Sequence, residues 1–499
     1  MPSLPASLPR ICVALGLDSA SGLSRALEHE YRDGSTFFEF RLDYMSQPEA
    51  GLDVIRKVRA RNPDLRVIAT CRHKQHSGGF EGTVEQQMAV LRNAVEAGAT
   101  AIDVEIETAE CAPLEIAKLR ELAPVIVSYH NFEHTPALSP LFRKLQRVPA
   151  DVYKIATTAR KPSDNLRLIE FARHHRGSPL VALAMSELGT VTRVLAPALG
   201  SKFTYASPCG AEGTAAGQIP ARVMRSLYRA DKLTKDSRIY GVIAEPVAHS
   251  KSPLIHNRAF QARRIDAVYI PFLVSPGQLG DFMELALELP VSGFSVTIPH
   301  KQRIMRHLDV VDPLARRVGA VNTVWRKRGQ WRGTNTDTQG VLKPLSRHLR
   351  LPHASILIAG YGGAARAAAI ALADAGAKIT ITGRNAKSAE MLAHAVRGEA
   401  MTIPEARKRR FDVLVHATPV GMWPKTDETV FPDTIPAQIV MDMIYNPHDT
   451  LLLKRAAEQG CTVIHGSEML IEQAACQFEI WTGEQAPRAV MQSAYEQHI

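Results

Sequence analysis

The sequence predicts an α/β protein made of two successive parts, and two observations lead to this expectation. Before residue 236, a short apolar strand followed by an amphipathic helix recurs about eight times. Later, an apolar strand at 355–359 runs through Gly360, Gly362 and Gly363 into an alanine-rich helix. Repeated strand–helix units are typical of a closed (β/α)8 or TIM barrel, whereas the glycine-rich turn is typical of a Rossmann sheet.

The composition is that of a folded protein with several domains. The 499 residues are 45% hydrophobic and 22% charged, which excludes the disordered class. Six cysteines are scattered without a CxxC pair or a Cys/His cluster. We therefore expect a reducing compartment, with neither a disulfide framework nor a metal site.

The chain is expected to be a cytoplasmic protein with no membrane partner. Its proline-rich opening is too short for a signal peptide and is expected to fray, and no apolar run reaches the ~18 residues of a spanning helix. The formal net charge is +10, but Lys and Arg are spread along the chain and aromatic residues make up only 6%. This pattern favours small anionic ligands over nucleic acid.

The first part contains a series of apolar runs with the length and composition of buried parallel strands. The predicted strands cover 11–17, 37–43, 65–71, 101–107, 125–130, 152–158, 180–185 and 202–206. Helical patterns fill the gaps, for example at 83–97 and 162–175, and a further helix is expected at 218–230. Right-handed crossovers between these strands would close the barrel.

Lys154 lies inside the apolar, β-branched run 152–158, where a lysine requires an explanation. Burial disfavours an ammonium ion and lowers the pKa of a lysine, which makes the amine available as a nucleophile towards a ketone. The resulting Schiff base can act as an electron sink. The alternative is a lysine whose stem follows the strand while its head reaches water.

Polar residues gather near the carboxyl ends of the predicted barrel strands, where this fold places catalytic groups. They are Glu39, Arg41, Arg72, Asp103, Glu105, His130 and Lys154. As a set they provide a potential imine-forming amine, an acid/base imidazole and cationic groups that bind anions. For Glu39 with Arg41, the alternative is a structural ion pair inside the barrel.

Several separated motifs resemble type I 3-dehydroquinate dehydratase over nearly all of the first part. In chain order they contain Glu39, Arg41 and Asp43, then Ser128 and His130, then Tyr153 and Lys154, then Arg193, and finally Ala216, Gly217, Gln218 and Ile219. The resemblance implies that Lys154 forms an imine with the substrate ketone and that His130 carries protons in a syn dehydration. An imidazole titrates near neutral pH, which suits that role.

The same resemblance implies the residues that hold the substrate. Arg193 is similar to the guanidinium that binds the substrate carboxylate, for which a planar bidentate donor is well suited. The residues implied to orient the ring and its hydroxyls are Glu39, Arg41, Arg72, Thr214 and Gln218. Ser77 stands before two glycines where many members carry glutamate, so the group that orients His130 is open, with Glu105 as one candidate.

The second part begins after a short polar linker at 231–237, with a new strand at 238–243. In its glycine-rich turn, backbone N–H groups can approach a pyrophosphate at the helix N-terminus. The next strand, 378–382, is followed by Arg384, near the place where NAD-binding proteins carry an acidic residue. A guanidinium there favours the 2′-phosphate of NADP, and a surface arginine is the alternative.

A second ordered series of motifs resembles shikimate dehydrogenase over essentially 238–499. Its polar members are Ser250, Ser252, Thr297, Lys301, Asn322, Asp337, Thr418, Tyr445 and Gln473. Viewed alone, the two serines would be helix caps and Lys301 a surface residue. Ser295 and Gly383 depart from the family's usual residues.

That resemblance implies a role for each residue. Lys301 and Asp337 form the catalytic pair, in which the ammonium gives a proton to the carbonyl oxygen while NADPH delivers hydride to the carbon. The substrate is bound by Ser250, Ser252, Thr297, Asn322, Tyr445 and Gln473. The cofactor NADP(H) is bound by Gly360, Gly362, Gly363, Ala364, Arg384, Thr418 and Met422.

Together the two resemblances imply three domains and two consecutive reactions. The domains are a dehydratase barrel at 1–235, a shikimate-binding α/β domain at 236–340 completed by helices at 466–499, and a Rossmann NADP domain at 341–465. The barrel would convert 3-dehydroquinate to 3-dehydroshikimate, which the second part would reduce to shikimate. The alternatives are a Schiff-base lyase fused to a quinate-preferring dehydrogenase, and a non-catalytic metabolite sensor.

Overall fold

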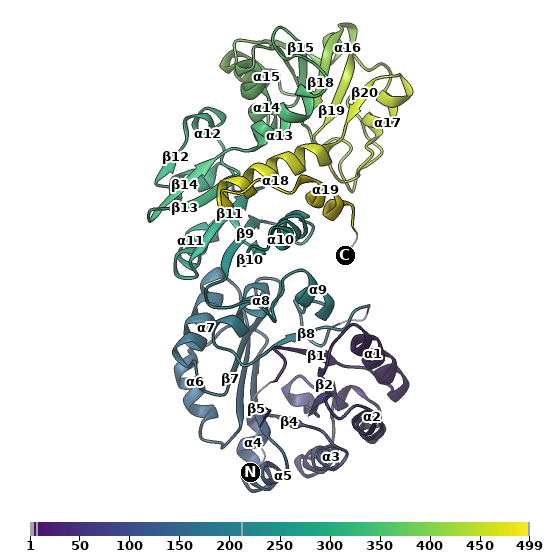
Figure 1. Ribbon diagram of the computed structural model, residues 1–499, viewed down its shortest axis with the longest axis vertical. Coiled ribbons are helices and arrows are strands. Elements are labelled where there is room, and N and C mark those ends of the chain that lie inside the picture. The colour runs from purple at the N-terminus through teal and green to yellow at the C-terminus, as the bar shows by residue number, and fades with distance from the viewer. Residues whose placement is uncertain (1–3, 6–7, 211–212, 498–499) are drawn as a thin grey trace. The chain divides into compact units, whose positions relative to one another are not determined.

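The computed structural model describes residues 4–5, 8–210 and 213–497. The chain divides into two compact units, which we call the first and second units. The first unit comprises Met1–Ile239 and Asp266–Pro290, and the second comprises Tyr240–Ile265 and Val291–Ile499. Figure 1 labels the helices and strands of both units.

Eight parallel strands form the predicted barrel in the first unit. The strands are β1 (Ile11–Leu15), β2 (Phe37–Arg41), β3 (Arg66–Thr70), β4 (Ala101–Glu105), β5 (Val125–Asn131), β6 (Val152–Thr158), β7 (Leu180–Met185) and β8 (Thr204–Ala206). Their order is β7-β6-β5-β4-β3-β2-β1-β8. The backbone N–H of Lys202 donates to the carbonyl of Leu180 at 2.9 Å, so the segment entering β8 returns to β7 and nearly closes the ring.

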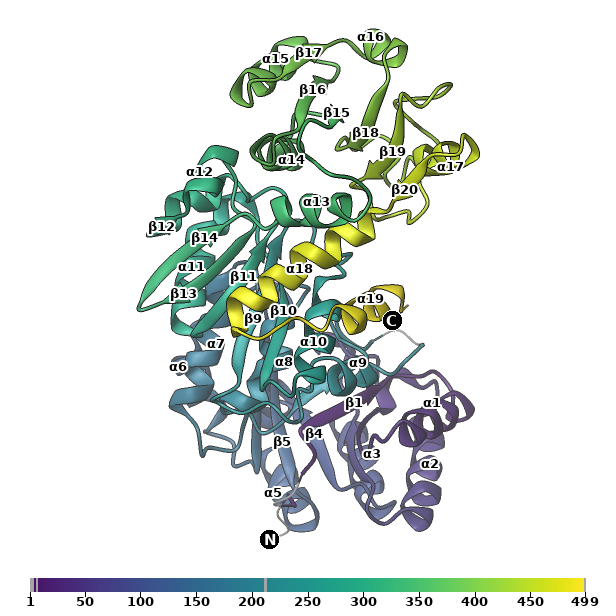
Figure 2. The same cartoon turned by 45° about the horizontal axis from the view of Figure 1, so that its top comes forward.

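Helices surround these strands in both views (Figures 1 and 2). The helices and 3-10 turns of the barrel are α1 (Ala20–Arg32), η1 (Leu42–Tyr44), α2 (Pro48–Arg61), η2 (Lys74–His76), α3 (Val84–Glu96), α4 (Ile106–Cys111), α5 (Pro113–Leu122), α6 (Leu138–Leu145), α7 (Pro162–His174), α8 (Thr190–Leu199) and α9 (Ala221–Ser226). The segment Asp266–Pro290 adds β10 (Ala267–Leu273), η3 (Pro276–Gln278) and α11 (Leu279–Glu288). The predicted helix at 83–97 is α3, which begins with a capping box between Thr83 and Gln86.

The helix predicted at 218–230 is much shorter than expected. It covers only α9, because the segment before it is extended and Pro220 forms a bridge with Ser207. Proline has no N–H to donate, so it suits the N-cap position that Pro220 occupies. Arg229 has a left-handed backbone, φ 53°, which is incompatible with a helix continuing to residue 230.

The strand register separates an apolar floor from a polar layer inside the barrel. The floor is a buried cluster that includes Cys12, Phe37, Ile68, Ala101, Ile126, Val152, Val181 and Tyr205, so every strand contributes to it. Side chains two residues apart in a strand share a face. Glu39, Asp103 and Lys154 each follow a floor residue by two positions, so the same register that buries the floor turns them into the barrel.

The second unit contains a mixed sheet and a parallel sheet. The mixed sheet includes, in spatial order, β9 (Arg238–Ala244), β11 (Val291–Val296), β13 (Thr323–Lys327), β14 (Gln330–Thr334) and β12 (Val310–Val311). Its helices and turn are α10 (Ser252–Ala262), η4 (Arg303–His307), α12 (Pro313–Val318), α13 (Asp337–Ser346), α18 (Gly466–Thr482) and α19 (Arg488–Glu496). The C-terminal helix α18 packs against α13, β11 and β13, and α19 packs against α10.

The parallel sheet has the strand order of a Rossmann fold. In chain order its strands are β15 (Ser355–Ala359), β16 (Lys378–Thr382), β17 (Glu399–Met401), β18 (Phe411–His416), β19 (Ala437–Asp442) and β20 (Thr462–Ile464), and their spatial order is β17-β16-β15-β18-β19-β20. Its helices are α14 (Gly363–Asp374), α15 (Ala386–Ala395), α16 (Ile403–Lys408) and α17 (Leu451–Glu458). The direction of strand addition reverses between β15 and β18, where open α/β sheets bind their ligands.

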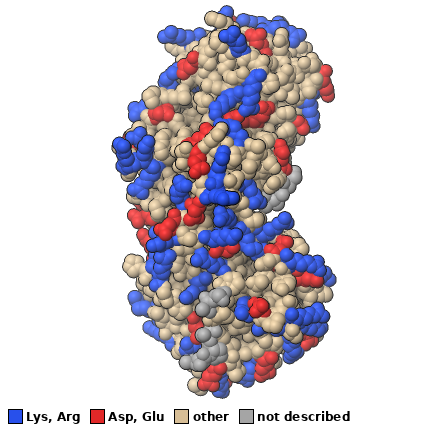
Figure 3. Space-filling view, in the orientation of Figure 1, with Lys and Arg blue, Asp and Glu red and all other residues tan. Residues whose placement is uncertain are grey.

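Charged side chains are mixed over the surface drawn in Figure 3, with Lys and Arg dispersed among Asp and Glu. All six cysteines are free thiols. Among the described residues, no helix combines the length and apolar character that crossing a membrane requires.

Candidate active sites

One cavity in the first unit brings together the residues predicted for the barrel site. It is lined by Glu39, Arg41, Arg72, His130, Lys154, Arg193, Thr214 and Gln218, together with Ser77, Phe132, Ala156, Leu183, Met185, Tyr205 and Ala215. All eight predicted barrel-site residues are therefore in one place, although they come from strands, loops and a helix spread over much of the first unit.

Lys154 is buried in this cavity and paired with two carboxylates. Its side chain is 5% exposed, so the alternative in which the head reaches water is wrong. Nζ donates to Asp103 Oδ2 at 2.9 Å and to Glu39 Oε1 at 3.2 Å. It also lies 4.1 Å from the ring centroid of Tyr205. The amine is thus held in a fixed position in the middle of the barrel.

Asp103 was placed in the predicted polar layer but not among the site residues, and the structure makes it the main partner of Lys154. Burial alone would raise the pKa of Asp103. The positive charges of Lys154 and Arg72 and a hydrogen bond from Ser128 outweigh burial, so its pKa lies below the ordinary value. Asp103 is therefore a carboxylate at neutral pH, and it provides the negative charge that lets a lysine lie inside the barrel.

His130 lies at the end of β5 and stacks on Phe132, with 6.2 Å between ring centroids. Burial lowers the pKa of His130 well below its ordinary value of 6.5, and the positive charges of Arg72, Lys154 and Arg41 lower it further. The imidazole is therefore neutral at pH 7. A neutral imidazole can accept a proton, so the electrostatics prepare His130 to act first as a base.

Arg193 and Arg72 present buried guanidinium groups with unpaired donors. Arg193 Nη2 donates to the carbonyl of Ala216 at 3.1 Å, but its buried Nε and Nη1 have no hydrogen-bond partner among the described residues. Burial lowers the pKa of Arg193 to about 10, so it is charged at neutral pH. The Nε and Nη2 of Arg72 likewise form no hydrogen bond to any residue that the structure describes, although Nη2 lies 3.6 Å from Asp103 Oδ1. A buried cation with unused donors is costly unless an anionic ligand completes it.

The remaining barrel residues have local partners. Arg41 binds Asp43 with two hydrogen bonds of 2.9 and 2.7 Å, so the ion pair considered between Glu39 and Arg41 is replaced by one with Asp43. Gln218 and Thr214 bind each other, because Gln218 Oε1 accepts from the Thr214 backbone at 2.8 Å and its amide donates to the hydroxyl at 3.2 Å. This pair links the two ends of the segment 214–218, which contributes Thr214, Ala215 and Gln218 to the lining of the cavity.

Glu105 does not contact His130 through any of its hydrogen bonds to the described residues. Its Oε1 accepts from the backbone of His73 at 3.1 Å, from Gln87 at 2.9 Å and from Thr108 at 3.0 Å. These bonds hold the loop after β3, which carries the cavity residue Ser77. Glu105 therefore supports that loop and does not orient His130 directly.

The second predicted pair forms in the second unit. Lys301 Nζ donates to Asp337 Oδ2 at 2.6 Å, and Asn322 donates to Asp337 Oδ1 at 2.7 Å. The same Asn322 amide lies 3.4 Å from Gln473 Oε1. Asp337 begins α13 and is buried, whereas the side chain of Lys301 is 23% exposed. The lysine is thus directed by a fixed carboxylate but keeps access to a ligand.

The other predicted substrate residues lie in less enclosed positions. Ser250 accepts a hydrogen bond from the Ser252 backbone at 3.3 Å, and neither serine caps α10, whose N-cap residue is Lys251. The backbone carbonyl of Tyr445 accepts a hydrogen bond from the Tyr495 hydroxyl at 2.7 Å, and the side chain of Tyr445 is exposed. Thr297 follows β11, four residues before Lys301. Ser295, a departure from the family pattern, is buried and donates to Gln477 at 2.8 Å.

The glycine-rich turn leaves room for a phosphate group. Gly360 has φ +127°, and a Cβ there would lie 2.6 Å from the carbonyl oxygen of Ala417, so only glycine fits. A Cβ on Gly362 or Gly363 would meet no atom within 4 Å. The N-terminus of α14, where Ala364 also lies, is therefore open to a ligand that approaches its N–H groups.

Two further positions complete the cofactor site. Arg384 is exposed just after β16, and a Cβ on its neighbour Gly383 would lie 2.7 Å from the Tyr361 ring, which explains the glycine there. After β18, Thr418 is held by His416, whose Nε2 lies 2.6 Å from the Thr418 hydroxyl. The other nitrogen of His416 lies 2.9 Å from buried Asp442. The pair of His416 and Asp442 was not predicted as part of the site. Both residues are buried and contact Thr418 or each other. Met422 is exposed beyond Thr418.

Three protein families match the chain. Type I 3-dehydroquinase matches residues 11–235, the shikimate dehydrogenase substrate binding domain matches residues 242–324, and the shikimate 5'-dehydrogenase C-terminal domain matches residues 466–494. A bifunctional 3-dehydroquinate dehydratase/shikimate dehydrogenase of Arabidopsis thaliana, described as chloroplastic, is 33% identical over 503 residues, covering 96% of this chain and 83% of that protein. The shikimate biosynthesis protein AroDE of Chlamydia pneumoniae is 34% identical over 382 residues, covering 76% and 78%.

Solved structures match the second part of the chain. A shikimate dehydrogenase in complex with NADP+ is 36% identical with a TM-score of 0.51, covering 53% of this chain and 96% of that one. The shikimate dehydrogenase of Aquifex aeolicus is 34% identical with a TM-score of 0.50, covering 52% and 98%.

Proposed function

The chain belongs to the family of bifunctional 3-dehydroquinate dehydratase/shikimate dehydrogenases, and from this premise we propose which residues perform each reaction. The enzyme is a lyase and an NADP-dependent oxidoreductase of the shikimate pathway. Lys154 and His130 carry out the dehydration, and Lys301 and Asp337 carry out the reduction. The observation that carries this assignment is the convergence of a buried lysine, a neutral histidine and an unsatisfied arginine on one cavity.

Dehydration begins when the ammonium group of Lys154 gives up a proton and the free amine attacks the ketone carbon of 3-dehydroquinate. The proton returns as water leaves, which gives a protonated imine. Neutral His130 removes the proton next to the imine carbon, and the positive nitrogen accepts the electron pair as an enamine. The enamine then expels the neighbouring hydroxyl, to which His130 returns the proton, so a second water leaves. Hydrolysis of the imine releases 3-dehydroshikimate and restores Lys154. Arg193 binds the substrate carboxylate with its two unused donors.

For the reduction, NADPH would supply the hydride that the carbonyl carbon of 3-dehydroshikimate accepts. Lys301 donates a proton to the carbonyl oxygen, and the 2.6 Å contact with Asp337 directs its ammonium group. Ser250, Ser252, Thr297, Asn322, Tyr445 and Gln473 hold the carboxylate and ring hydroxyls. Gly360, Gly362, Gly363 and Ala364 would hold the pyrophosphate of the cofactor, and Arg384 would pair with its 2′-phosphate. Thr418 and Met422 would also contact the cofactor.

The domain limits and the compartment are further parts of the proposal. The dehydratase barrel occupies 1–235, the substrate domain of the reductase occupies 236–340 with 466–499, and the cofactor domain occupies 341–465. The packing of α18 against α13 and β11 supports the assignment of the C-terminal helices to the substrate domain. We place the enzyme in the cytoplasm, with small anionic metabolites as its partners and without a nucleic-acid or membrane partner.

Two variants and two assays test the assignment. Lys154→Ala should abolish conversion of 3-dehydroquinate while leaving NADPH-dependent reduction of 3-dehydroshikimate unchanged, because Lys154 belongs to the barrel alone. Lys301→Ala should have the opposite effect. In each variant, the activity that is retained is the control for folding. Loss of both activities in either variant would contradict the separation of the sites.

Chemical trapping tests the imine itself. Borohydride added during turnover of 3-dehydroquinate should reduce the imine and attach the substrate skeleton to one lysine, which peptide mass spectrometry identifies. Lys154 is the expected residue, and Lys154→Ala protein should remain unlabelled. Labelling of another residue would remove the nucleophile assignment while leaving the family membership intact.

A further inference from the structure

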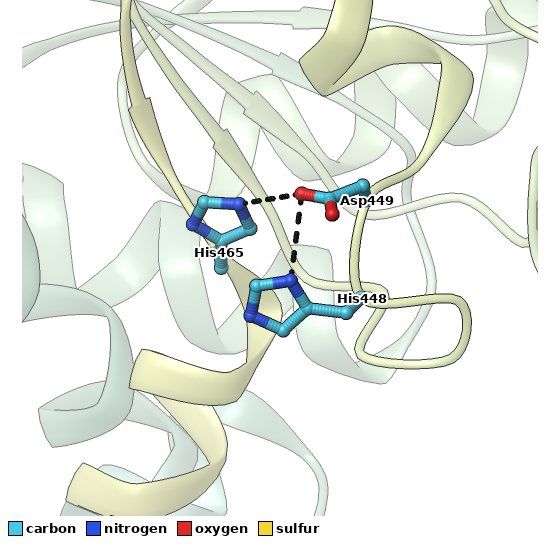
Figure 4. A group of neighbouring side chains, drawn as sticks. All are labelled: His448, Asp449 and His465. Carbon is cyan, nitrogen blue, oxygen red and sulfur yellow. Dashed lines mark hydrogen bonds and ion pairs between the residues drawn. The ribbon is translucent and has the colours of Figure 1, made fainter. Parts of the chain in front are cut away.

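Two histidines and one aspartate of the second unit turn their side chains towards one another (Figure 4), and none of them is among the residues proposed for either reaction. His448 and Asp449 follow β19, and His465 immediately precedes α18. His465 Nε2 lies 3.0 Å from Asp449 Oδ1, and His448 Nδ1 lies 3.4 Å from the same oxygen. The two imidazole rings are stacked with 4.3 Å between their centroids.

These spacings match those between ligands of a metal ion. Ligand atoms bound at 2.0 to 2.2 Å to one tetrahedral zinc ion lie about 3.3 to 3.6 Å apart. The three ligand atoms of the cluster lie within 4.8 Å of one another, and the two measured pairs differ from that spacing by only a few tenths of an ångström. An imidazole nitrogen binds a metal ion in the plane of its ring, so the two stacked rings must turn about their side-chain bonds, together with the carboxylate, to bind one ion.

The ligand types indicate which ion fits. Imidazole nitrogen suits zinc and related transition metals, whereas magnesium and calcium prefer a shell of oxygen atoms. Two imidazoles and one carboxylate form a common zinc ligand set, in which water takes the fourth position. Water can reach that position, because Asp449 and His448 are exposed and His465 is partly exposed.

We propose that His448, Asp449 and His465 form a zinc-binding site that fastens the loop after β19 to the start of α18. The loop contains Tyr445, and α18 contains Gln473, so the site joins the two elements that carry these proposed substrate residues. The loop already has one fastening, because the Tyr495 hydroxyl donates to the Tyr445 carbonyl at 2.7 Å. A zinc ion would add a second fastening on the side of His448.

The test measures zinc binding to the full chain after chelator treatment. Isothermal titration with zinc chloride should show one equivalent per chain for the natural protein. Asp449→Asn and His465→Gln should each weaken that affinity by at least about tenfold, since even the loss of a group that only supports a ligand costs 10- to 100-fold. His348→Gln removes an exposed histidine elsewhere in the second unit and is the matched control, with unchanged zinc affinity expected. Magnesium chloride should give no comparable binding.

Cobalt substitution provides a second measurement that does not depend on the variants. Cobalt(II) bound to the natural protein should give the visible d–d absorption of a four- or five-coordinate nitrogen and oxygen site, without a thiolate charge-transfer band. The proposal is overturned by the absence of stoichiometric binding, by zinc affinity that persists in both variants, or by a thiolate band, which would place the ion on cysteine. Neither measurement uses an enzyme assay, so failure of the zinc site would leave the proposed catalytic residues untouched.

Discussion

Arg193 combines a buried positive charge with two nitrogen atoms that donate no hydrogen bond within the described part of the chain. Such an arrangement destabilises the free protein, because a desolvated charge without a full set of partners is unfavourable. Evolution tolerates it where a ligand supplies the missing partner. A substitution of Arg193 should therefore affect substrate binding without reducing stability. The other charged groups of the cavity lie near an opposite charge, so their substitution would affect both.

Arg193→Met should weaken the binding of 3-dehydroquinate without weakening the fold. Loss of charged hydrogen bonds to the carboxylate should raise the KM of the dehydratase about 10- to 100-fold, as expected for interactions of 1.5 to 3 kcal/mol. The free energy of unfolding should stay constant or rise, because an unbranched apolar side chain replaces an unpaired cation. Steady-state kinetics and denaturant unfolding measure the two effects, with exposed Arg147→Met as control. A large loss of stability with an unchanged KM would show that the role of Arg193 is structural.

The lowered pKa of His130 predicts where the dehydratase activity decreases on the acid side of its pH profile. Its folded-state pKa lies well below 6.5, mainly because of burial and then because of Arg72, Lys154 and Arg41. The neutral base is therefore present from pH 7 down through 6.5, and it is lost only as the pH falls through the lowered pKa. The kcat/KM for 3-dehydroquinate should therefore stay nearly constant as the pH falls through 6.5 and decrease only at lower pH. An acid limb centred at or above pH 6.5 would be inconsistent with this environment.

At the scale of elements, the turn between β15 and α14 contains two glycines with different reasons for being glycine. Gly360 has a positive φ and contacts the Ala417 carbonyl, so it is required by the backbone. Gly362 has an ordinary φ of −72° and open space around it, so the fold itself does not require glycine at this position. A matched pair of substitutions can therefore separate the folding of the turn from its binding of a cofactor.

Gly360→Ala should reduce the stability of the protein by about 1 to 3 kcal/mol, because the new Cβ meets a carbonyl and the backbone is strained. Gly362→Ala should cost no more than about 1 kcal/mol, the scale of an N-cap change, but should raise the KM for NADPH about tenfold or more by obstructing the N-terminus of α14. Dehydratase activity of Gly362→Ala is the control for folding. Equal KM values for NADPH in Gly362→Ala and the natural protein would remove this turn from the cofactor site.

The elements also show where sequence reasoning succeeds. The runs that became β6 and β7 were predicted exactly as observed, because a buried parallel strand is a continuous apolar segment with a clear beginning and end. The α9 region was misjudged, since helical periodicity alone does not reveal that Pro220 joins a bridge or that Arg229 is left-handed. Local backbone geometry of that kind depends on neighbours distant in the sequence.

For the whole molecule, predictions failed where a residue acts through a partner far along the chain. Lys154 stands out in its own strand, but its partner Asp103 is 51 residues away and resembles any charged residue in a strand. The same holds for His465 and Asp449, which are 16 residues apart. Their spacing in the sequence does not match a known metal-binding motif. Motif resemblance supplied the groups proposed to bind the substrate, whereas the groups that hold those side chains in place became visible only in the fold.

The net charge of the whole chain predicts a common salt dependence for both reactions. Both substrates are carboxylates and the protein carries a formal net charge of +10, so long-range attraction should speed their encounter with either site. This attraction is screened beyond about 10 Å at 0.1 M salt. The kcat/KM of each reaction should therefore fall as sodium chloride increases from about 0.02 to 0.5 M, over which the screening length shortens severalfold. Sucrose at matched viscosity controls for diffusion, and potassium acetate controls for specific effects of chloride. If one reaction loses kcat/KM while the other does not, the charge that matters is local to one site and the attraction of the whole chain is too weak to contribute.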